Sequence, residues 1–85
     1  MVTVLIVPTY RGPVMHAWGG DPILGGKART ACGPVLPVTE AIEVHVKPDT
    51  AAWERAKAEH RDCHVCLRCN RIVTAARPPR GENER

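Results

Sequence analysis

Near its C-terminal end the chain reads Cys63-His64-Val65-Cys66-Leu67-Arg68-Cys69-Asn70-Arg71. Successive cysteines in this stretch are separated by two residues. This spacing lets a tight turn direct the Cys66 and Cys69 thiolates at one metal ion. Backbone amides of such a turn can donate hydrogen bonds to the sulfurs and so stabilise their negative charge. The stretch therefore predicts a metal knuckle, with Zn2+ as the expected ion.

The completion of this site decides how the chain must fold. Two thiolates are not enough, because a structural zinc site uses four ligands in a tetrahedron. No Cys or His follows Cys69 in the chain. The remaining ligands come either from the neighbouring Cys63 or His64, or from residues farther upstream: His16, Cys32 and His45. Upstream ligands require the N-terminal half to fold back onto the knuckle, which then organises the whole domain.

Length and composition indicate one small domain that needs a metal for stability. The 85 residues include no Phe, one Tyr and two Trp, so the core must be built mostly from aliphatic side chains. A chain of this size buries only about 60–65% of its unfolded surface, and a bound metal is the available reinforcement. We expect a single zinc-binding domain over residues 1–77 and a disordered tail over residues 78–85, where proline is the only apolar residue type.

The state of the cysteines depends on the compartment in which the protein works. Four cysteines also permit two disulfides, or free and redox-active thiols. The apolar run at residues 1–8 has no positively charged segment before it and is too short for a secretory signal. No run approaches the roughly 20 apolar residues of a membrane helix. We therefore expect a cytoplasmic protein without membrane contact, whose cysteines stay reduced and bind metal.

Apolar patterning predicts strands in the first half of the chain. Residues 2–7 form an apolar run that ends at Pro8, as in a strand buried on both faces. Residues 40–47 alternate between apolar and polar side chains, which is the clearest strand pattern in the chain. Shorter strands are expected over residues 14–18 and 28–32. Residues 34–37 are extended, but their prolines exclude them from a central strand.

These strands carry the upstream candidates for metal binding. His16 lies beside the core if its face of the strand points inward, although a buried histidine can also be purely structural. Cys32 directly precedes Gly33, which lets the backbone turn around a metal; the alternative is a buried free cysteine that packs as a small hydrophobe. His45 shares the solvent-facing side of its strand with Glu43, which argues against it as a ligand.

Two helices are expected in the second half of the chain. Residues 51–61 are rich in good helix formers, and Asp49 or Thr50 can cap them. The second helix starts in the knuckle, ends before Pro78 and turns one apolar face towards the core: Cys69, Ile72, Val73 and Ala76. The expected fold is therefore α+β, a small zinc-stabilised domain in which a short antiparallel sheet packs with one or two C-terminal helices.

Three stretches together resemble a pattern in small zinc-binding, zinc-finger-like proteins of actinobacteria and their phages: His16, Thr30-Ala31-Cys32-Gly33 and Val65-Cys66-Leu67-Arg68-Cys69-Asn70-Arg71. In those proteins a histidine is followed by a distant Thr-x-Cys-Gly and by a terminal Cys-x-x-Cys knuckle with a basic residue after it. The resemblance implies one Zn2+ held by four residues of this chain: His16, Cys32, Cys66 and Cys69. Cys63 is a rival for the fourth position.

Two classes of function are compatible with such a site. A closed site with three thiolates has no position open to water, which predicts a non-catalytic zinc-binding module. Arg68 and Arg71 on the exposed side of the second helix would then contact a macromolecular partner, as in a phage or actinobacterial regulatory protein. The partner is a host protein or a nucleic acid, because the net charge of +3 permits weak nucleic-acid contact without requiring it. The alternative is a thiol-redox or metal-dependent enzyme that uses the Cys-x-x-Cys cluster.

Overall fold

The computed structural model describes residues 2–75 and confirms the expected α+β fold. A four-stranded sheet has the order β5-β1-β2-β6, and a separate two-stranded sheet pairs β3 with β4. The elements are β1 (Val2–Val7), β2 (Val14–Ala17), β3 (Lys27–Arg29), β4 (Val35–Pro37), β5 (Glu40–Val44), α1 (Asp49–Glu59), β6 (His64–Val65) and α2 (Leu67–Thr74). The tail predicted for residues 78–85, and Ala76 at the end of the second helix, lie outside the described residues.

Strand β1 lies inside the sheet, between β5 and β2, and both pairings are antiparallel. Strand β6 adds a short parallel pairing to the outer edge of β2. Val4 and Ile6 of β1 belong to the core that the helices cover, while Leu5, on the opposite face, is also fully buried. The run at residues 2–7 is therefore a strand buried on both faces, as predicted.

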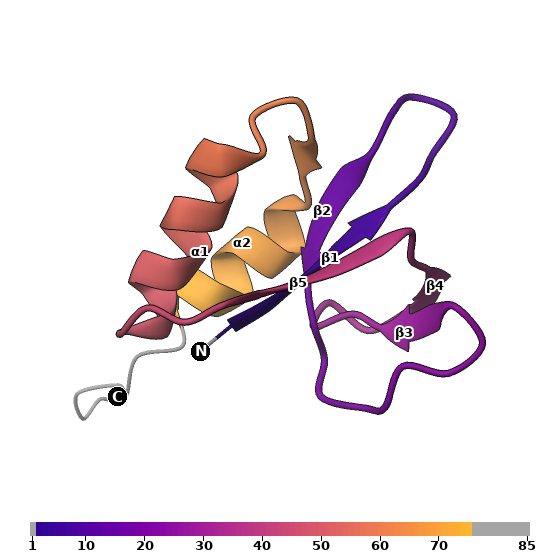
Figure 1. Cartoon of the computed structure of the whole chain (residues 1–85), viewed down its shortest axis with the longest axis horizontal. Coiled ribbons are helices and arrows are strands. Elements are labelled where there is room, and N and C mark those ends of the chain that lie inside the picture. Colours follow the sequence, from indigo (N-terminus) through magenta and orange to yellow (C-terminus); the bar gives the residue numbers. More distant parts are fainter. Residues whose placement is uncertain (1, 76–85) are drawn as a thin grey trace.

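The main core lies between the sheet and the two helices, which cover one face of it (Figure 1). Trp53 of α1 is the largest fully buried side chain, and Cys69 and Val73 of α2 pack in the same cluster. Asn70 ties the helices together, because its Oδ1 accepts hydrogen bonds from Trp53 Nε1 and from Lys57 Nζ, each at 2.8 Å. The helix that follows the knuckle is thereby fixed against α1.

Some boundaries differ from the predictions for physical reasons. The strand expected over residues 40–47 ends at Val44, because Val44 pairs with Val2, the first residue of β1. The strand expected over residues 28–32 ends at Arg29, and the chain then turns. Ile72 was expected on the buried face of the second helix, but it is 43% exposed, so Cys69 and Val73 make the buried contacts of α2.

Helix α1 begins two residues earlier than expected, so Asp49 and Thr50 lie in its first turn instead of capping it. Pro48, with extended backbone, occupies the N-cap position. A negative charge in the first turn is favoured by the helix dipole. Arg55 and Glu59 form an ion pair across one turn of α1, with Arg55 Nε 3.2 Å from Glu59 Oε2. Within the described residues, neither helix is long and apolar enough to cross a membrane.

Candidate metal centre

The outer edge of β2 assembles the site around His16. Beyond the short pairing with β6, two backbone hydrogen bonds attach other segments to this edge. The Cys66 amide donates to the Met15 carbonyl at 2.9 Å, and the Ala31 amide donates to the Ala17 carbonyl at 2.8 Å. His16 lies between these two carbonyls in the sequence of β2, so the knuckle and the turn that carries Cys32 are held on either side of it.

The turn after β3 positions Cys32. The Gly33 amide donates to the Thr30 carbonyl at 3.1 Å, and the Thr30 amide donates to the Pro34 carbonyl at 2.9 Å. Gly33 has a φ of 123°, a conformation that residues with a side chain rarely adopt. The glycine after the cysteine is therefore needed for the turn, as the sequence indicated.

The knuckle supplies the other two sulfurs from the start of α2. Cys66 is the N-cap residue of this helix, and its Sγ accepts a hydrogen bond from the Cys69 amide at 3.5 Å. This is the amide-to-sulfur contact expected of a metal knuckle. Cys69 lies in the first turn of α2 and is fully buried. Its sulfur faces inward, towards β2.

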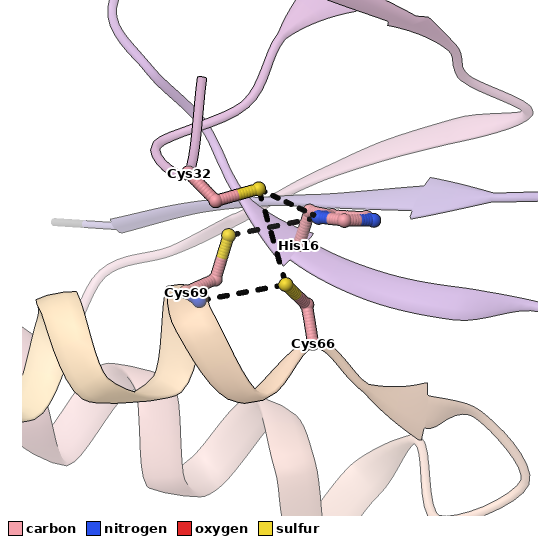
Figure 2. A group of neighbouring side chains, drawn as sticks. All are labelled: His16, Cys32, Cys66 and Cys69. Atoms are coloured by element: carbon pink, nitrogen blue, oxygen red, sulfur yellow. Dashed lines mark hydrogen bonds between the residues drawn. The ribbon is translucent and has the colours of Figure 1, made fainter. Parts of the chain in front are cut away.

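The four donor atoms converge on one point (Figure 2). His16 Nδ1 lies 3.6 Å from both Cys32 Sγ and Cys69 Sγ, and Cys66 Sγ lies 3.9 Å from Cys32 Sγ. All four atoms lie within 4.8 Å of one another. A tetrahedral ion with bonds of about 2.3 Å to sulfur and 2.0–2.1 Å to nitrogen separates two sulfurs by about 3.8 Å, and sulfur from nitrogen by about 3.5 Å. The arrangement therefore fits a metal ion with one nitrogen and three sulfur ligands.

Because the cluster is buried, the charged forms of its thiols and imidazole are disfavoured unless a cation is bound. Burial raises the pKa of the Cys69 thiol to about 12, and it lowers the pKa of the His16 imidazole. Burial also opposes ionisation of Cys32, but hydrogen bonds from Thr30 and the neighbouring thiols outweigh it and lower the pKa of this thiol. A metal cation would offset the thiolate charges, so its binding must release protons.

Thr30 contacts the Cys32 sulfur, and the sequence did not predict this contact. Thr30 Oγ1 lies within hydrogen-bond distance of both Cys32 Sγ, at 3.1 Å, and the Pro34 carbonyl oxygen, at 2.9 Å. Its side chain is buried with 1% of its surface exposed. The only signal in the sequence is a threonine two residues before a cysteine, which is too common to indicate such a contact by itself.

The other candidates lie outside the cluster of donor atoms. Cys63, the expected rival, is half-buried beside the core; burial and the carboxylates of Asp62 and Glu40 raise the pKa of its thiol. His64 is exposed on β6. His45 is exposed as expected, with Nε2 3.5 Å from Glu43 Oε1. Among the described residues, the group that could hold a metal consists of His16, Cys32, Cys66 and Cys69.

The site is thus made by residues from three separated segments: strand β2, the turn after β3, and the knuckle. Its four donor atoms lie close enough together to hold one metal ion. Comparison with known proteins found no matching family model, no similar protein with a curated function and no similar solved structure.

Proposed function

We propose that this protein is a zinc-stabilised, non-catalytic module that acts by binding a macromolecular partner. The observation that carries the proposal is the set of four donors: one imidazole and three thiols whose atoms lie within 4.8 Å of one another, with separations of 3.6, 3.6 and 3.9 Å that match a tetrahedron. Tetrahedral sites of sulfur and nitrogen are typical of zinc. Four protein ligands complete the coordination of a structural zinc ion, whereas a catalytic zinc keeps one position for water or substrate.

The surroundings of the site support a structural ion over an enzyme. Cys69 is fully buried and His16 nearly so, which closes the ion off on the side of the core, while Cys32 and Cys66 are partly buried. Burial raises the pKa of both the Cys63 and the Cys69 thiols, which makes these two residues poor redox nucleophiles. Thiol ligands also require a reducing compartment, which is consistent with a cytoplasmic protein. We further propose kinship with the small zinc-binding proteins of actinobacteria and their phages, with a regulatory function.

The outer face of α2 is the surface we propose for the partner. Arg68 and Arg71 are exposed there, and neither makes an ion pair within residues 2–75. The helix has no acidic residue, and Leu67 beside the arginines is 76% exposed. Unpaired guanidinium groups beside an exposed apolar side chain suit a negatively charged macromolecule.

The double change Arg68→Ala/Arg71→Ala is expected to weaken partner binding at least tenfold without affecting the fold, because both side chains are exposed. Binding is measured with random-sequence single-stranded and duplex oligonucleotides across a salt series, and by capture from lysate with and without nuclease. Each lost phosphate contact should reduce the salt slope by about 0.7 for single strands and 0.9 for duplex.

A matched control is Arg55→Ala/Arg61→Ala, which removes the same two charges from exposed positions in and after α1. This control should bind like the wild type. If the α2 double variant matches the wild type in both assays, α2 is not the binding face and the proposal fails.

A further inference from the structure

The loop that joins β1 to β2 presents the single tyrosine of the chain to solvent. Tyr10 is 93% exposed, and the loop projects away from the helices (Figure 1). Backbone hydrogen bonds close the turn in both directions between Thr9 and Gly12, at 3.1 and 2.9 Å. The Thr9 hydroxyl adds two more, since it donates to the Gly12 carbonyl and accepts from the Arg11 amide. Tyr10 is therefore held on an ordered turn with its ring almost entirely in water.

Arg11 lies beside this ring. Its guanidinium carbon is 5.6 Å from the centre of the Tyr10 ring, within the range of a cation–π contact. The pair combines an exposed aromatic face with a cation at the apex of a turn. These are the two components that bind single-stranded nucleic acids without sequence preference: the ring stacks on a base, and the cation attracts the backbone.

The segments that flank the turn carry no acidic residue of their own. Residues 2–20 and 63–75, which include β1, β2, β6 and α2, contain no Asp or Glu. The pairing of β6 with β2 brings the two segments together, and a side chain at Gly12 would lie 3.9 Å from the His64 ring. The acidic residues of the described chain lie on other segments: Asp21, Glu40, Glu43, Asp49, Glu54, Glu59 and Asp62. Two carboxylates lie next to these segments: Glu40 pairs with Ile6 of β1, and both Glu40 and Asp62 are close enough to act on the Cys63 thiol.

The isolation of Tyr10 favours a nucleic acid over a protein partner. Aromatic hot spots of protein interfaces lie within a packed apolar patch that excludes water. The other exposed large apolar residues lie outside the turn: Ile23, Leu24, Val35, Leu67 and Ile72. A duplex keeps its base faces stacked inside, whereas a single strand can lay a base on a projecting ring.

We infer that the partner is a single-stranded nucleic acid, that Tyr10 stacks on one of its bases, and that Arg11, Arg68 and Arg71 contact its backbone. This inference deepens the function proposed above and rests on it. These residues would bind DNA and RNA strands alike, because the ring accepts any base.

The test uses the zinc-loaded full chain and fluorescently labelled random-sequence oligonucleotides at low salt: single-stranded DNA, single-stranded RNA and duplex DNA. Tyr10→Ala is expected to weaken binding to both single strands about tenfold and to leave duplex binding unchanged. Tyr10→Phe keeps the ring and should retain wild-type affinity. Neither change should alter zinc content or thermal stability, because the side chain is exposed. With 3-fluorotyrosine incorporated, the single fluorine resonance should shift when a single strand is added.

The outcomes separate this inference from the proposed function. If Tyr10→Ala binds single strands as the wild type does, or if the wild type binds none, the inference is overturned. If α2 variants nevertheless lose a partner captured from nuclease-treated lysate, the module binds a protein and the proposed function stands. If binding of single strands depends on Tyr10 but not on Arg68 and Arg71, the loop that joins β1 to β2 is the contact. The assignment of the α2 face as the binding surface is then wrong.

Discussion

Removal of the proposed zinc ion is expected to unfold the protein. The ion would join strand β2, the turn after β3 and the knuckle, which otherwise meet through backbone hydrogen bonds and a small shared core. The core between the sheet and helices contains one large aromatic side chain, Trp53, among aliphatic residues and small side chains. Structural zinc contributes roughly 10–16 kcal/mol in isolated finger peptides. The net stability of a whole domain is only about 5–15 kcal/mol, so the metal-free chain should lack a stable fold.

This expectation is tested by circular dichroism and calorimetry before and after treatment with a strong chelator, with elemental analysis of the same samples. The treated protein should lose its cooperative melting transition, and added zinc should restore it. Added magnesium serves as the control ion, because it prefers oxygen ligands and octahedral geometry. A chain shown to be free of metal that still melts cooperatively at the original temperature would refute the structural importance of the ion.

Replacement of a knuckle cysteine is expected to have an effect of similar size. Cys66→Ser and Cys69→Ser each remove a sulfur from a cluster whose atoms lie within 4.8 Å of one another. Both variants should fail to retain zinc during dialysis against a weak chelator. Cys69→Ser removes a fully buried member of the core as well as a ligand, so we expect this variant to fold less well than Cys66→Ser at the same zinc concentration.

Cys63→Ser is the matched control for these variants. It makes the same chemical change three residues before Cys66, at a cysteine outside the cluster, and it should retain one zinc per chain. His16→Ala should lower the zinc affinity, because it removes the only nitrogen donor of the cluster. Loss of zinc from Cys63→Ser, together with retention by His16→Ala, would show that the fourth ligand is assigned wrongly.

The sequence predicted the parts of this site that depend on local geometry. The spacing of two residues between Cys66 and Cys69 indicates a metal knuckle in any fold. The glycine after Cys32 likewise indicates a tight turn. The choice between Cys63 and His16 stayed open from the residues alone, because separation along the chain does not determine distance in space. In the structure the outer edge of β2 places His16 between the two segments that carry the sulfurs.

Features that depend on distant partners were harder to predict. The end of β5 at Val44 is set by the start of β1, which no local pattern near residue 44 reveals. The exposure of Ile72 follows from how α2 lies on the core, since Cys69 and Val73 already fill the contact that one short helix can make. The contact between Thr30 and the Cys32 sulfur likewise depends on the turn closing onto the Pro34 carbonyl.

X-ray absorption spectroscopy at the zinc edge of the purified protein tests the central claim most directly. A site made by His16, Cys32, Cys66 and Cys69 should show one nitrogen at about 2.0–2.1 Å and three sulfurs at about 2.3 Å, with no water. Four sulfurs would place Cys63 in the site in place of His16. A coordinated water oxygen with fewer sulfurs would indicate an open, catalytic type of site, and either result would contradict the closed site of one nitrogen and three sulfurs.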